Sequence, residues 1–98
     1  MGNYMIDINL PETYDPDFMA LIPQQRAFTF NMMKKGVIIN YSLSVDRKKL
    51  WVILSAESVQ EVKGILGSFP IFSYIKFTIH DLLFHESREI AVPHFWLN

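Results

Sequence analysis

Apolar and polar residues alternate with a period of two along four short segments of the chain. This period places successive side chains on opposite faces of a strand, and here it predicts one aliphatic face and one mixed face. A polar turn joins the second segment to the third, as in a hairpin. The four predicted strands cover residues 4–10, 37–45, 50–56 and 75–80.

Two other segments have the three-and-four spacing of helices with one apolar side. The first begins at Asp15, an N-cap carboxylate followed by a proline suited to the first helical position, and stops at Gly36. Pro23 lies inside this segment and predicts a kink or a restart of the helix. The second helix begins with a capping box at Ser58 and ends at Gly67.

The predicted elements follow the order βαββαβ, which is ferredoxin-like. The expected fold class is therefore α+β, with an antiparallel four-stranded sheet whose aliphatic face is covered by both helices. We predict a single domain over residues 1–98, with a core at about residues 4–85 and a C-terminal oligomerisation tail at 86–98. The tail is too apolar for a solvated terminus, so we expect it to be ordered.

The sheet face opposite the helices is too apolar for open water and too polar for a dry core. A sheet-to-sheet dimer that encloses a wet, mixed cavity fits this composition best. The predicted mixed face carries Met5, Asp7, Asn9, Ile38, Asn40, Ser42, Ser44, Trp51, Ile53, Ser55, Tyr74, Lys76, Thr78 and His80.

Composition narrows the possible classes of protein. Half of the residues are apolar, which favours self-association. The net charge is −1, which argues against a nucleic-acid partner. No cysteine is present for a disulfide or a thiolate metal site, and His80, His85 and His94 lack the spacing of metal ligands, so no metal or other cofactor is expected. No apolar run approaches the roughly 20 residues that span a bilayer, so we expect a cytoplasmic protein without a membrane partner.

The turn at residues 69–74, Phe-Pro-Ile-Phe-Ser-Tyr, the strand after it and the loop residue His85 resemble the last third of muconolactone isomerases. The resemblance extends to Leu10-Pro11 with Asp15-Pro16, to Lys35-Gly36 and to the helix start at Ser58-Val59. It implies a dimeric α+β barrel, often assembled into larger homo-oligomers. It also implies a cofactor-free shift of a lactone double bond during aromatic catabolism.

The second strand departs from the pattern of these isomerases, in which it is rich in Trp and Arg with a nearby His. Here residues 37–44 read Val-Ile-Ile-Asn-Tyr-Ser-Leu-Ser and contain no basic side chain. A carboxylate substrate is usually held by at least one charged donor such as arginine. We therefore predict that the chain is a poor or inactive muconolactone isomerase.

Proton transfer within a lactone needs a group whose pKa lies near the working pH. Asp7 and His80 are the candidate catalytic pair, because strand one is expected beside strand four. The alternative is a structural ion pair across the two strands. Arg26 borders the apolar stripe of the first helix and either approaches a pocket beneath it or extends along the surface. The candidate ligand-binding residues are Asn40, Ser42, Trp51, Tyr74 and Lys76. The alternative role of Trp51 and Tyr74 is packing at an interface, and the alternative for Asn40 and Ser42 is that they face water on an edge strand.

Two functional hypotheses follow. The first is a protein of the muconolactone isomerase-like group that binds a small organic molecule and, if it is an enzyme, acts as a cofactor-independent isomerase by general acid–base proton transfer. The alternative is a non-catalytic homo-oligomeric protein whose mixed sheet face serves assembly only. In both hypotheses the expected macromolecular partner is another copy of the chain.

Overall fold

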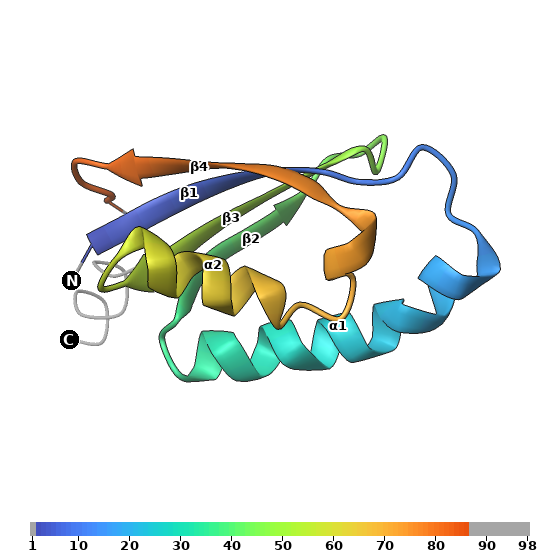
Figure 1. Cartoon of the computed structure of the whole chain (residues 1–98), viewed down its shortest axis with the longest axis horizontal. Helices are drawn as coiled ribbons and strands as arrows, with labels where there is room; N and C mark the ends of the chain where they lie inside the picture. Colours follow the sequence, from blue (N-terminus) through green and yellow to red (C-terminus); the bar gives the residue numbers. More distant parts are fainter. Residues whose placement is uncertain (1, 87–98) are drawn as a thin grey trace, which may run out of the picture.

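Both helices lie on one side of a single antiparallel sheet in the computed structural model, which describes residues 2–86 (Figure 1). The strand order is β2-β3-β1-β4, so the first and last strands are neighbours, and the predicted ferredoxin-like α+β fold is confirmed. Apart from Glu86, the predicted tail at 86–98 lies outside the described residues. The elements are β1 (Gly2–Asn9), α1 (Pro16–Lys34), β2 (Ile38–Leu43), β3 (Lys49–Ala56), α2 (Val59–Gly67), the 3-10 turn η1 (Phe72–Tyr74) and β4 (Lys76–Leu82).

Helix α1 begins where its capping residues predict. The Asp15 carboxylate accepts a hydrogen bond from the backbone N–H of Phe18 at 2.8 Å, which satisfies one of the free amides of the first turn. The helix stops before Gly36, whose φ of +79° lies in the left-handed region that glycine tolerates. Pro23 lies inside one continuous helix, so the helix does not restart; Figure 1 shows its first turns inclined to the rest.

The short helix α2 is fixed at its start by two side chains. The Ser58 hydroxyl accepts a hydrogen bond from the backbone N–H of Glu61 at 3.2 Å, as in a capping box. The Glu61 carboxylate reaches one residue further back than the motif requires and accepts from the backbone N–H of Glu57 at 2.7 Å. Neither α1 nor α2, the two α-helices of residues 2–86, is long and apolar enough to cross a membrane.

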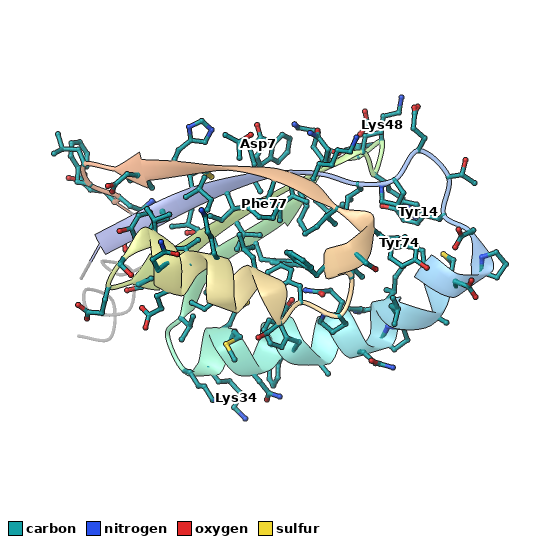
Figure 2. All side chains as sticks on the ribbon, viewed as in Figure 1. Asp7, Tyr14, Lys34, Lys48, Tyr74 and Phe77 are labelled. Carbon is teal, nitrogen blue, oxygen red and sulfur yellow. The ribbon has the colours of Figure 1, made fainter. Side chains whose placement is uncertain are left out.

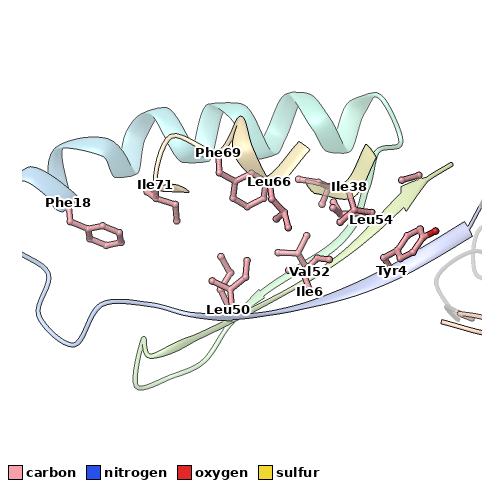
Figure 3. Packing of buried hydrophobic residues seen from close by; sticks show 13 residues of the cluster. Tyr4, Ile6, Phe18, Ile38, Leu50, Val52, Leu54, Leu66, Phe69 and Ile71 are labelled. Carbon is pink, nitrogen blue, oxygen red and sulfur yellow. The ribbon is translucent and has the colours of Figure 1, made fainter. Parts of the chain in front are cut away.

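The core fills the space between the helices and the aliphatic face of the sheet (Figure 3). Its strand residues come from alternate positions, as the period of two requires, and the helices close over them. Burial of each such side chain contributes roughly 1.5–3 kcal/mol. Those that are fully shielded from solvent are Ile6, Ile8, Val52, Leu54, Val62 and Leu66.

Strand β2 departs from its predicted alternation. Ile38 pairs with Leu54 and Asn40 pairs with Ile53, so two steps along β2 match one step along β3. Such a bulge turns the residues before it to the other face of the sheet. Ile38 is consequently only 2% exposed in the helix-side core, and its predicted place on the mixed face is wrong.

Tyr74 also lies on the helix side. It belongs to η1, because β4 begins two residues later at Lys76. Its ring packs edge-on against Phe18 of α1, with 5.2 Å between the ring centroids, and Figure 2 shows it between the sheet and α1. The prediction that Tyr74 belongs to the mixed face is therefore wrong, because the turn at 69–74 keeps its side chain under the helices.

Candidate functional site

The mixed face, on the side of the sheet away from the helices, contains six of the seven predicted site residues. Asp7 of β1 lies between Trp51 of β3 and Thr78 of β4, and His80 lies diagonally next to it, opposite Met5. Figure 2 shows Asp7 on the far side of the sheet from the helices. The six residues are Asp7, Asn40, Ser42, Trp51, Lys76 and His80.

The ionic partner of Asp7 on this face is Lys49. Its Nζ lies 2.6 Å from Asp7 Oδ1 and donates a hydrogen bond to Asn9 Oδ1 at 2.8 Å. Asp7 Oδ1 has no aligned hydrogen bond among the described residues, so the contact is electrostatic. Both side chains of the pair are about one-third exposed, at 34% and 37%, and such pairs stabilise a fold by only about 0–1 kcal/mol. Lys49 thus takes the place that the strand pattern predicted for His80.

A cavity of about 440 Å³ lies on the opposite, helix side of the sheet, bordered by α1, the β2–β3 hairpin and the loop after β1. Its volume is within the range of roughly 300–1,000 Å³ that is common for small-molecule sites. The wall passes from buried residues to exposed ones, so the cavity has a floor and a mouth. The lining residues are Leu10, Tyr14, Phe18, Met19, Ile22, Gln25, Arg26, Tyr41, Leu43, Arg47, Leu50 and Ile71.

Gln25 supplies the buried polar group of this cavity and is only 3% exposed. Its Nε2 donates to Thr29 Oγ1 at 3.2 Å and to the Tyr41 hydroxyl at 3.4 Å. Its Oε1 accepts from the backbone N–H of Ile71 at 3.4 Å. These bonds satisfy a buried amide that would otherwise be costly, and they tie α1 to β2 and to the turn before β4.

Two positively charged side chains lie at the mouth of the cavity, whose wall is mainly apolar. Arg26 comes from α1 and Arg47 from the β2–β3 hairpin, and both are exposed. The Tyr14 hydroxyl donates to the Arg47 carbonyl at 2.7 Å, which fastens the loop after β1 to the hairpin. Burial raises the pKa of Tyr14 above 10.0, so its phenol is protonated at neutral pH.

The hairpin that carries Arg47 is held by a compact hydrogen-bond network. Asp46 Oδ1 accepts from the Ser44 hydroxyl at 2.7 Å and from the Lys48 backbone N–H at 3.0 Å. These two hydrogen bonds lower the pKa of Asp46 below 3.8. Arg47 itself has a φ of +63°, which is uncommon for a residue with a side chain.

The sequence pattern pointed to Arg26 beside a pocket under α1 but not to the other polar residues of the cavity. Gln25 was detectable as one of two polar residues, with Thr29, at inward positions of the apolar stripe of α1. The sequence pattern did not indicate that Arg47 lies at the cavity, because its place there depends on how the hairpin folds back beside α1. The described residues contain no group of three His, Asp or Glu side chains placed to hold a metal ion.

The sequence and the fold of this chain are similar to those of known proteins. The sequence model of the family described as muconolactone delta-isomerase matches residues 3–88. A crystal structure of muconolactone isomerase superposes with a TM-score of 0.71 at 17% sequence identity, covering 87% of this chain and 92% of that one. No curated protein sequence matches. The structural likeness shows a shared fold, and the family match extends over most of the sequence. The chain therefore belongs to the muconolactone delta-isomerase family.

Proposed function

We propose that this protein binds a small organic acid in the cavity beneath α1. The observation that carries the proposal is the combination of an apolar space of about 440 Å³ with two arginines at its mouth. Apolar walls favour a ring or short hydrocarbon, because removing such groups from water is favourable. A guanidinium group favours a carboxylate, to which it donates two parallel hydrogen bonds. Arg26 and Arg47 are the residues that hold the acid.

The cavity supports binding more strongly than rapid isomerisation. Among residues 2–86, the titratable side chains in its lining are two tyrosines and two arginines, with no carboxylate and no imidazole. The Tyr14 phenol is protonated at neutral pH and donates to the Arg47 carbonyl, so it does not act as a base. A lactone bound there by one protomer lacks an efficient base, so any muconolactone isomerase activity is slow.

A separate proposal is that Asp7 and His80 are the catalytic groups. They lie on the mixed face, across the sheet from the cavity, and a ligand beneath α1 is out of their reach within one protomer. They act on a ligand only if it binds the mixed face, together with Asn40, Ser42, Trp51 and Lys76.

Self-association through the mixed face is a second proposal. Ile53 is only 6% exposed on this face, and Trp51 beside it is 38% exposed. Asn40 Oδ1 is shielded from solvent and has no hydrogen-bond partner among residues 2–86. A second copy lying against this face would cover its apolar groups.

Isothermal titration with a carboxymethyl-substituted γ-butyrolactone tests where the ligand binds. Arg26→Ala is expected to weaken binding about tenfold or more, since a hydrogen bond to a charged group contributes roughly 1.5–3 kcal/mol. His80→Ala and Asp7→Asn are expected to leave binding unchanged. Loss of binding in these two variants but not in Arg26→Ala would show that the ligand binds the mixed face instead of the cavity. Turnover of muconolactone by the unmodified protein should be slow, and rapid turnover would contradict the absence of a base in the cavity.

A further inference from the structure

The orientation of the Gln25 amide is fixed by a backbone group. The N–H of Ile71 only donates hydrogen bonds, so the group that faces it at 3.4 Å must be Oε1. The flipped amide would set two N–H groups against each other. Nε2 therefore lies on the side of Thr29 and Tyr41.

This orientation determines the role of the Tyr41 hydroxyl. Nε2 of Gln25 donates toward the phenol oxygen at 3.4 Å, so that oxygen acts as the acceptor of the pair. The phenol proton is left to donate elsewhere. No residue of the described part of the chain accepts a hydrogen bond from it, and Tyr41 lines the cavity.

We infer that Tyr41 is a specificity-determining residue that donates a hydrogen bond to a ligand oxygen inside the cavity. This inference rests on the proposed function, and it narrows the ligand to an acid that carries a second oxygen acceptor. The carboxylate is held by Arg26 and Arg47, and the carbonyl or ring oxygen is held by Tyr41. Gln25 is a positioning residue, because it acts only through the Tyr41 hydroxyl.

A preference of this kind is expected to be large. A site whose hydroxyl donates to a ligand oxygen binds an analogue without that oxygen less tightly, because the hydrocarbon ring displaces water from the half-buried phenol and offers it no acceptor. An acid of the same shape with a hydrocarbon ring keeps the apolar contacts and the contacts to arginine. It loses only the Tyr41 hydrogen bond.

The test compares two probes by isothermal titration: a carboxymethyl-substituted γ-butyrolactone and cyclopentylacetate, which has the same ring size and acid arm but no ring oxygen or carbonyl. The unmodified protein is expected to bind the lactone acid at least about tenfold more tightly. Tyr41→Phe keeps the ring and should bind both probes equally. Tyr4→Phe removes a hydroxyl from the core outside the cavity lining and should keep the preference.

Tyr41→Met provides a second variant should Tyr41→Phe fail to fold. It also removes the phenol proton while it keeps a long apolar side chain at this place in the cavity wall, so the preference should again be lost. A preference that survives in the variant that folds would overturn the role of Tyr41. So would equal binding of the two probes by the unmodified protein, and in both cases the cavity remains a site for acids. Failure of both probes to bind the unmodified protein would overturn the proposed function as well.

Discussion

The two faces of the sheet share the same strands but differ in what they do with polar side chains. On the mixed face, Asp7, Asn9 and Lys49 lie in a shallow array, partly exposed, and pair with one another. On the helix side, Gln25 is buried and Arg26 stands at the edge of a cavity. The difference shows that a polar composition alone does not make a binding site, which also needs a concave surface. Here the concave surface is formed by α1 and the β2–β3 hairpin, whose relative position the strand pattern does not predict.

Ile53→Glu tests whether the mixed face is an assembly surface, and it has the largest expected effect. Ile53 is 6% exposed, opposite Met5, so a carboxylate there is buried without a partner. We expect the free energy of unfolding to fall by at least about 3 kcal/mol and the assembly to dissociate. Denaturant unfolding and size-exclusion chromatography with light scattering measure the two effects.

Val45→Glu is the matched control for this change. Val45 is fully exposed just beyond β2, so the same added charge should alter neither stability nor mass. If the unmodified protein is monomeric at micromolar concentration, the proposal of assembly through the mixed face is wrong. The cavity proposal would stand.

Arg47→Gly changes both the backbone strain and the charge at the cavity mouth, and the two effects are measured separately as stability and ligand affinity. Glycine adopts a φ of +63° freely, whereas a residue with a side chain is strained there by roughly 1–2 kcal/mol, partly offset by the entropy that glycine loses. We expect the free energy of unfolding to rise by about 0.5–1 kcal/mol and the affinity for the lactone acid to fall several-fold. Chemical denaturation and isothermal titration report the two quantities. Unchanged affinity would show that Arg47 does not hold the ligand.

Asp46→Asn has the smallest expected effect and depends on pH. The folded-state pKa of Asp46 lies below its ordinary value of 3.8, because the ionised carboxylate accepts hydrogen bonds from Ser44 and Lys48. Its stabilising contribution is therefore present above the ordinary value and is lost as the pH falls through the lower, folded value. Thermal unfolding should show the variant slightly less stable at neutral pH, with the difference vanishing in acid. A difference that grows in acid would contradict this sign.

Much of the fold was predictable because it depends on local patterns. Alternation placed the strands, and the residues at Asp15, Gly36 and Ser58 fixed where the helices begin and end. The side of Ile38 was not predictable, because a bulge in β2 is set by pairing with β3 rather than by the sequence of β2 itself.

The candidate site was less predictable than the fold. Periodicity assigns a side chain to a face, so Asp7 and His80 were correctly placed on the same face. It does not show which long side chain reaches which partner, and Lys49 was missed for that reason. The cavity joins α1, β2 and the β2–β3 hairpin, which follow one another along the chain. Periodicity does not show how these elements fold against one another, so only the packed structure brings Gln25, Tyr41 and Arg47 together.

Amide NMR during titration with the carboxymethyl-substituted γ-butyrolactone tests most directly whether the ligand binds beneath α1. We expect saturable shifts for the backbone amides of Gln25, Arg26 and Tyr41, with little change at Asp7 and His80. Saturable shifts centred on Asp7, Trp51 and His80, with the cavity residues unmoved, would contradict binding beneath the helix.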